Sequence, residues 1–276
     1  MAQLYLVGTP IGNLEDLSPR AQRILQQVNF VVAEDTRRTR RLLKHFDIGG
    51  SVESLHAHSD KKKVDYVVSL LEDGDVAYVT DAGTPGLSDP GAILVKAART
   101  SGHAVVPVPG PSALSTALSV SGFESTGATF LGFLPERKSK RLEILDSALS
   151  IGLPIVIFVG PKAVMATVIE LSERLGEDTQ VTICRELTKM HEQVVSCAIG
   201  KVINEPVITV GRGEYTLVVN PGPVTALEIS DRALKSELKG LFDKGMTHRD
   251  ASIHLAAKHS ISRGRVYKLG IEIQDD

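Results

Sequence analysis

Short apolar runs alternate with amphipathic segments over the first 112 residues of the chain. β-branched and aromatic residues dominate the runs, which predicts strands, and there is little apolar–polar alternation, which is typical of parallel strands covered by helices on both faces. The expected strands are 3–8, 29–34, 52–55 (the weakest), 76–81 and 104–108. The expected helices are 18–27, 36–45, 60–72 and 89–101. The pattern therefore predicts an N-terminal α/β domain over residues 1–112.

A second α/β domain is expected over residues 113–225, after a proline-rich hinge at 107–112. Its expected strands are 128–132, 154–159, 179–184, 192–198 and 215–220, and its clear helical patterns are 138–149 and 161–175. Because two strand runs follow each other directly within 179–198, we expect antiparallel pairing there and a mixed sheet.

The last segment, residues 230–276, has a helical pattern. An amphipathic stretch at 231–244 is followed by Thr247 and Asp250, which resemble a capping box and begin a helix that runs through His259. Ser262 is placed to cap a third helix. Helix, short turn and helix are the outline of a helix-turn-helix, and two interpretations remain open: a packing or dimerisation element, or an RNA contact.

Composition describes an ordinary soluble globular protein, with 42% hydrophobic and 23% charged residues. Its apolar runs are too short for a membrane helix, its N-terminus lacks the pattern of a signal peptide, and its two cysteines lie in apolar runs. We therefore expect a cytoplasmic protein. The net charge is −2, yet Lys and Arg gather at 37–44, 61–63 and 137–141. Each cluster taken alone indicates a solvated helix face, while the three together favour a polyanionic substrate.

Glycine- and proline-rich turns follow three of the expected parallel strands, at 8–14, 81–91 and 109–113. In open α/β sheets, ligands bind outside the carboxyl ends of the strands, and glycines let the backbone approach a ligand closely. The first turn lacks the glycine spacing of a dinucleotide fingerprint, and no turn has the Gly-Lys-Ser/Thr of a P-loop. Because prolines remove the N–H groups that phosphates need, a ligand with an adenosine, a carboxylate and a sulfonium but no phosphate fits better.

These segments also carry a resemblance to a known family. The matching stretches are LYLVGTPIGNLEDLSPRA (4–21), VAEDTRRT (32–39), LHAHSD (55–60), VTDAGTPGLSDPG (79–91), VPGPSALSTALSVSG (108–122), FLGFLP (130–135), CRELTK (184–189) and RGEYTLVV (212–219). Over nearly all of residues 3–220 the chain resembles the tetrapyrrole methylase superfamily, and within it the branch that methylates a cytidine 2′-hydroxyl near the decoding centre of 16S rRNA. The resemblance implies two α/β domains with S-adenosylmethionine (SAM) in the cleft between them, a homodimer, and 16S rRNA or the 30S subunit as partner.

The resemblance also implies which positions bind the cofactor. These are Pro10, Asp81, Gly83, Thr84, Leu87, Pro109, Ser112, Ala113, Phe158, Val159, Glu186, Leu187, Tyr215 and Thr216. The segment FVGPKAV (158–164) departs from the family, which usually has Phe-Tyr-Glu-Ser-Pro-His-Arg-Leu there, and His191 and Ser59 replace a more common aromatic residue and asparagine. These departures concern substrate contact rather than the cofactor fold.

Candidate groups for handling the acceptor proton are Glu34, Asp35, Glu186 and Lys189, the last as a desolvated base. Asp35 has a competing and slightly favoured interpretation as the cap of the arginine-bearing helix. Candidate RNA contacts are Arg37, Arg40, His56, His58 and Lys189. We expect no metal, because no third ligand accompanies the two histidines at metal-ligand spacing. Besides RNA methylation, methylation of a tetrapyrrole or other small molecule and a non-catalytic RNA-binding role remain open.

Overall fold

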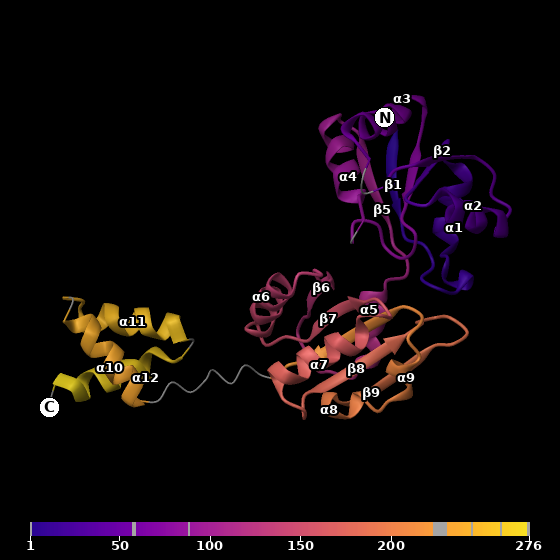
Figure 1. Ribbon diagram of the computed structural model, residues 1–276. Coiled ribbons are helices and arrows are strands. Elements are labelled where there is room, and N and C mark those ends of the chain that lie inside the picture. The colour runs from indigo at the N-terminus through magenta and orange to yellow at the C-terminus, as the bar shows by residue number, and fades with distance from the viewer. Residues whose placement is uncertain are drawn as a thin grey trace. The chain divides into compact units, whose positions relative to one another are not determined.

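A computed structural model describes residues 2–56, 59–87, 89–222, 231–243, 245–259 and 261–274 (Figure 1). The chain divides into two compact units, Met1–Gly222 and Pro223–Asp276. The first unit contains two separate five-stranded sheets. Its predicted division into domains at residue 112 stays a prediction.

The first sheet is entirely parallel, with the strand order β3-β2-β4-β1-β5. Its strands are β1 (Gln3–Val7), β2 (Phe30–Ala33), β3 (Ser51–Ser54), β4 (Val76–Val79) and β5 (Ala104–Val108). Its helices are α1 (Pro19–Gln27), α2 (Thr36–His45), α3 (Lys61–Asp73) and α4 (Gly91–Thr100). Helices α3 and α4 contribute to one core cluster and α1 and α2 to another, so both faces are covered. This arrangement confirms the parallel α/β sheet that the apolar runs predict.

The order of the strands brings the three predicted turns together. β1 lies between β4 and β5, with Leu4 paired to Val76 on one side and to Val105 on the other. In a parallel sheet the carboxyl ends of neighbouring strands lie at one edge. The turns after β1, β4 and β5 therefore begin at the same edge.

The second sheet is mixed, with the order β6-β7-β10-β8-β9. Its strands are β6 (Thr129–Phe133), β7 (Ile155–Val159), β8 (Gln180–Arg185), β9 (Gln193–Ala198) and β10 (Tyr215–Asn220). β6 and β7 are parallel, and the other pairs are antiparallel, which confirms the predicted β8–β9 pairing. The helices are α5 (Ala113–Ser121), α6 (Lys138–Leu149), α7 (Val164–Leu175), α8 (Ile199–Val202) and α9 (Pro206–Thr209), with a 3-10 turn η1 (Leu14–Asp16) in the first half.

Helices α5, α8 and α9 were not expected from the sequence, and α7 begins later than expected. α5 was not expected, because serine, threonine and valine supply about half of it and have low helix propensity. It forms because Ala117 packs into a core cluster with Val156 and Val218 of the sheet beneath. α7 begins at Val164 rather than at 161, because a turn in which the Ala163 N–H donates to the Gly160 carbonyl (2.9 Å) comes first.

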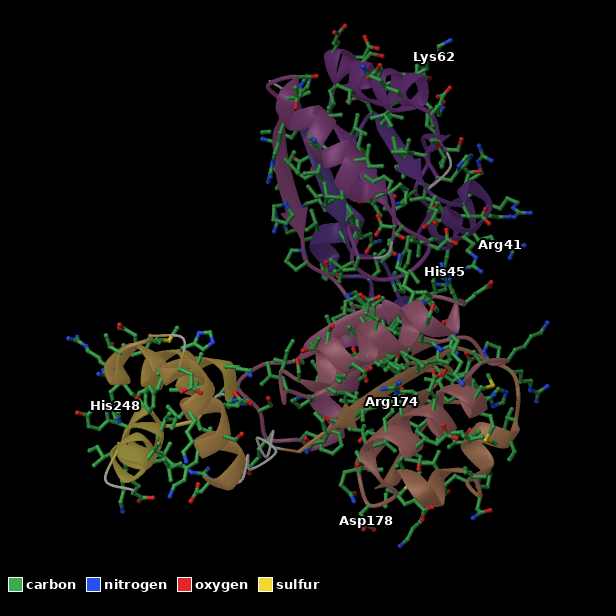
Figure 2. All side chains as sticks on the ribbon, turned by 60° about the vertical axis from the view of Figure 1, so that its left-hand side comes forward. Arg41, His45, Lys62, Arg174, Asp178 and His248 are labelled. Atoms are coloured by element: carbon green, nitrogen blue, oxygen red, sulfur yellow. The ribbon has the colours of Figure 1, made fainter. Side chains whose placement is uncertain are left out.

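The second unit is a three-helix bundle of α10 (Asp231–Phe242), α11 (His248–His259) and α12 (Arg263–Gln274). Its core side chains are Leu234, Leu238, Ala251, Leu255, Val266 and Leu269. The Asp250 N–H donates to the Thr247 hydroxyl (3.2 Å) and the Arg265 N–H to the Ser262 hydroxyl (3.3 Å), so both predicted caps are confirmed. Figure 2 shows His248 within this bundle, where its ring packs on Phe242 and Tyr267. Among the described helices, none is both long and apolar enough to cross a membrane.

Candidate active site

Hydrogen bonds join the three strand-end turns into one rigid wall. Thr9 of the first turn and Gly83 of the second exchange two backbone hydrogen bonds, each 3.0 Å long. The Thr84 hydroxyl donates to the carbonyl oxygen of Pro111 in the third turn, at 3.2 Å. Turns that are far apart in sequence thus hold each other in place, which pre-organises a ligand site.

The backbones of the first and third turns approach each other closely at Gly8 and Gly110. A Cβ on Gly8 would lie 2.7 Å from the Cα of Gly110, and one on Gly110 would lie 2.8 Å from the Cα of Gly8. Contacts below 3.0 Å would force the backbone apart, so glycine is required at both positions. These two glycines set the close approach of the turns.

A cavity of about 370 Å³ opens beside this wall. Its volume lies in the range of small-molecule sites, about 300–1,000 Å³. Ten of the positions predicted to bind a cofactor line it: Asp81, Gly83, Thr84, Leu87, Ser112, Ala113, Phe158, Val159, Tyr215 and Thr216. The loop at the end of β7 and the start of β10 are neighbours because those strands are antiparallel, with Tyr215 opposite Val159.

Four positions that were predicted to bind the cofactor lie outside the lining: Pro10, Pro109, Glu186 and Leu187. Leu187 is 8% exposed and packs into the core around Cys184 and Val218. The Glu186 carboxylate is engaged by Lys189. Contact between these four positions and the cofactor stays a prediction.

The sequence did not single out nine of the lining residues: Ile11, Arg38, Thr80, Ala82, Phe133, Gly160, Pro161, Gly213 and Glu214. Most of them adjoin a predicted residue, and that adjacency is the signal that could have found them. Phe133 is different, because it comes from the end of β6, and only the pairing of β6 with β7 places it beside Phe158.

The chemistry of the lining fits SAM. Phe133, Phe158 and Leu87 supply apolar surface, while Thr84 and Ser112 supply hydroxyl groups. Three carboxylates, those of Glu34, Asp81 and Glu214, line the cavity and suit a positively charged sulfonium. Arg38 is the one cationic residue in the described lining and is paired with Asp81 at 3.4 Å, so the cavity holds no cluster of cations for phosphates.

Glu34 is the lining carboxylate best suited to accept a proton. It follows β2, and its carboxylate accepts a hydrogen bond from the Thr80 hydroxyl at 3.1 Å. Burial raises the pKa of Glu34 above its ordinary value of 4.5, and the hydrogen bond from Thr80 opposes that rise only in part. A raised pKa makes a carboxylate a stronger base near neutral pH.

Asp35 has the geometry of a helix cap. Its carboxylate accepts a hydrogen bond from the backbone N–H of Arg37 at 2.8 Å and a second from the Arg37 guanidinium at 3.2 Å. These hydrogen bonds lower the pKa of Asp35 to about 2. A carboxylate held so firmly in its charged form is a weak base, so the structure supports capping of α2 over the alternative role in proton transfer.

Glu186, Lys189 and Glu214 form a compact ion cluster at the margin of the cavity. The Lys189 ammonium donates to Glu186 and to Glu214, each at 2.9 Å. Burial alone would lower the pKa of Lys189, but its hydrogen bonds to the two carboxylates raise it instead. Burial likewise opposes ionisation of Glu186, yet the hydrogen bonds from Lys189 and from the Glu214 N–H leave its pKa lowered. Because a base needs a depressed lysine pKa, the structure argues against Lys189 as a desolvated base.

Replacing Lys189 by methionine is expected to lower stability by about 0.2–1 kcal/mol for each ion pair lost at neutral pH. Because the pKa of Glu186 is depressed in the folded state, its ion pair adds stability above the ordinary value of 4.5 and loses it as pH falls further. The difference in Tm between wild type and Lys189→Met should therefore be present at pH 7 and shrink below pH 4.5. Thermal unfolding across this pH range measures it, with the exposed Lys201→Met as control; an unchanged difference at low pH would contradict the cluster.

Arg37, Arg40 and His56, three of the predicted RNA contacts, lie on the surface of the first unit. Lys189 is half-buried in its ion cluster, and His58 lies outside the described residues. The Arg37 side chain is 85% exposed and pairs with Asp35. Arg40 is exposed and donates to the Val52 carbonyl at 3.4 Å. The backbone N–H of His56 donates to the Ser59 hydroxyl. Figure 2 shows Arg41 and Lys62, from two of the basic clusters, on the outside of this unit.

No group of three His, Cys, Asp or Glu side chains within the described part of the chain is arranged to hold a metal ion. What the cavity presents to a ligand is mainly carboxylates, hydroxyls and aromatic rings.

Comparisons with known proteins agree with this fold. A uroporphyrin-III-C-methyltransferase from Thermus thermophilus matches 80% of this chain and 95% of its own with a TM-score of 0.56 and 18% identity. A diphthine synthase matches 79% of this chain and 90% of its own with a TM-score of 0.62 and 13% identity. At these identities the two structures show a shared fold and no more.

Sequence comparison defines the class and the family. The protein called "Ribosomal RNA small subunit methyltransferase I" from Synechocystis sp. is 38% identical to this chain, and the match covers 100% of both chains. The protein of the same name from Escherichia coli O157:H7 is 34% identical, and the match covers 99% of this chain and 96% of its own. That of Thermotoga maritima is 40% identical over 80% of this chain and 99% of its own. The cavity at the strand ends thus belongs to a SAM-dependent methyltransferase. Residues 3–203 match "Tetrapyrrole (Corrin/Porphyrin) Methylases", and the chain belongs to this family.

Proposed function

We propose that this enzyme methylates the ribose 2′-hydroxyl of a cytidine in 16S rRNA near the decoding centre. The observation that carries the proposal is the similarity along the whole chain to proteins named for methylation of small-subunit rRNA. The exposed basic clusters support a polyanionic substrate despite the net charge of −2.

SAM, when bound, supplies the methyl group and the leaving group of an in-line displacement. The chain supplies alignment and removal of the hydroxyl proton. The linked turns hold the cofactor wall fixed, and alignment of this kind contributes up to roughly 7–11 kcal/mol in the best intramolecular models. Glu34, with its raised pKa, accepts the proton of the attacking hydroxyl, a contribution of about 10²–10⁴-fold. Alignment therefore accelerates the transfer more than proton removal does.

The substrate is tested by offering purified enzyme and labelled SAM three acceptors: naked 16S rRNA, assembled 30S subunits and a uroporphyrin. We expect label in one of the two RNA acceptors and none in the uroporphyrin. The modified nucleotide is found by alkaline hydrolysis, since a methylated 2′-hydroxyl can no longer attack the adjacent phosphodiester. Label in the uroporphyrin alone would make the chain a small-molecule methylase, and SAM binding without transfer to any acceptor would make it a non-catalytic RNA-binding relative.

We also propose that the enzyme works as a homodimer in the cytoplasm. The family resemblance supports the dimer, and the two cysteines without a disulfide suit a reducing compartment. Sedimentation at micromolar concentration tests the dimer; a monomer mass there would exclude it.

A further inference from the structure

A second cavity, of about 300 Å³, adjoins the cofactor cavity. The two share Phe133, Phe158, Val159 and Gly160 in their linings. The two cavities therefore meet at these shared residues, and a molecule in the second cavity lies next to one in the first. An acceptor must lie in this kind of place, because the methyl group passes directly from donor to acceptor.

Phe133 presents an aromatic ring at this shared boundary. The residue is 64% exposed, which is unusual for phenylalanine. Its ring contacts that of Phe158 edge to face at 5.6 Å, and Phe158 contacts Phe130 in the same way at 4.9 Å. These edge-to-face contacts support the Phe133 ring from one side, and the exposed part of the ring stays open to a ligand.

The walls of the second cavity suit a neutral planar group. Arg141 and Glu170 form a close ion pair at 2.7 Å, and Arg141 also donates to the Pro135 and Glu136 carbonyls, so its charge is already compensated. Thr167 is 7% exposed, and its hydroxyl makes no hydrogen bond to any described residue. The Thr167 hydroxyl is therefore available to hydrogen-bond to the edge of a base.

Three cationic residues follow the cavity lining directly in the sequence. Arg137, Lys138 and Lys140 begin α6 just after the cavity residues Phe133–Glu136, and all three are exposed. None of them forms an ion pair within the described part of the chain. Cationic side chains beside an aromatic platform are the usual arrangement for single-stranded nucleic acid.

We propose that the second cavity receives a nucleobase of the substrate RNA, which stacks on Phe133 while Arg137, Lys138 and Lys140 hold the adjoining phosphates. Single-stranded bases are commonly recognised by stacking on aromatic side chains and by hydrogen bonds to their edges. This inference rests on the proposed function and adds to it the residues that hold the acceptor nucleotide.

The absence of tryptophan from the chain gives a direct test of stacking. In Phe133→Trp the single indole reports on the platform, and stacking of a base should quench its fluorescence. The probes are oligocytidylate, an abasic ribose-phosphate strand of equal length, and SAM alone. Ile151→Trp, at a position 54% exposed and outside both cavities, is the control.

We expect oligocytidylate to quench Phe133→Trp, the abasic strand to leave it unchanged, and Ile151→Trp to respond to neither. Because Phe133 also lines the first cavity, SAM alone gives the baseline and oligocytidylate is added at saturating SAM; no further quenching by oligocytidylate would overturn the proposal. Equal quenching by both strands would also overturn it, because phosphate contact would then be sufficient.

Filling the cavity gives a kinetic test on the natural substrate. Ala166 lines the second cavity and not the cofactor cavity. Ala166→Leu should therefore weaken the apparent affinity for RNA about 5- to 100-fold, the usual range for one lost stacking contact. The affinity for SAM should stay unchanged. Glu173→Leu, exposed on the same helix, is the matched control. If wild type methylates RNA and Ala166→Leu matches it in KM, the cavity inference fails while the proposed function stands. If wild type methylates no RNA, the proposed function fails, and the quenching experiment still decides whether the cavity takes a base.

Discussion

Ala113→Phe is expected to weaken SAM binding strongly in an otherwise folded protein. Ala113 is the first residue of α5 and lines the cavity at the strand ends, where the third turn enters that helix. A phenyl ring there occupies space the ligand needs. The wall behind it cannot retreat, because Thr84 is hydrogen-bonded to Pro111 of the same turn. Overpacking costs about 1–3 kcal/mol, so we expect SAM affinity to fall about 10- to 100-fold, as measured by calorimetry.

Val120→Phe is the matched control for this substitution. Val120 lies on the same helix, is 45% exposed and does not line the cavity. The control should bind SAM as wild type does, and both variants should keep the wild-type circular dichroism spectrum. Unchanged SAM affinity in folded Ala113→Phe would show that the cofactor binds elsewhere.

Local patterns predict the elements of this fold well where one periodicity dominates. Ser18 accepts a hydrogen bond from the Ala21 N–H and is followed by proline, so α1 begins where its cap places it. β4 is buried at every position, as its unbroken apolar run requires. α5 escaped prediction because its formation depends on packing against the second sheet rather than on its own sequence pattern.

The same distinction applies to the site. The three turns could be predicted because the carboxyl ends of parallel strands converge on one edge whatever the details of packing. The lining residues that come from the second sheet depend instead on how its strands pair with each other. Tyr215 reaches the cavity because β10 runs antiparallel to β7, and Phe133 reaches it because Phe133 pairs with Phe158 across β6 and β7. Register between distant strands leaves little trace in a single sequence.

The fold shifts the pKa values of the candidate acid–base residues in ways that differ from one residue to the next. Asp35 and Glu34 are adjacent in sequence, yet hydrogen bonds lower the pKa of the first to about 2 while burial raises that of the second. Lys189 lies between two carboxylates that the sequence separates by 28 positions. Thr80 and Glu214 come from other elements, so the states of Glu34 and Lys189 could not be assigned from the sequence. Arg37 lies beside Asp35 in the chain, and the sequence already favoured Asp35 as a cap.

Glu34→Gln is expected to lower kcat at saturating SAM about 10²–10⁴-fold, the usual contribution of a general base. Glutamine keeps the size of the side chain and can still pair with the Thr80 hydroxyl, but it cannot accept the proton of the attacking ribose. Single-turnover transfer of labelled methyl to RNA measures the chemical step directly. Wild-type turnover by Glu34→Gln would exclude Glu34 as the base.

The pH profile separates a base from a merely structural carboxylate. Because burial raises the pKa of Glu34 above 4.5, wild-type kcat should fall with decreasing pH at a higher pH than an exposed glutamate would give. Glu34→Gln should have no such acid limb. The hydrogen bond from Thr80 favours the charged form of Glu34, so Thr80→Val should move the acid limb to still higher pH while leaving the plateau largely intact. An acid limb that persists in Glu34→Gln, or stays in place in Thr80→Val, would show that another group takes the proton.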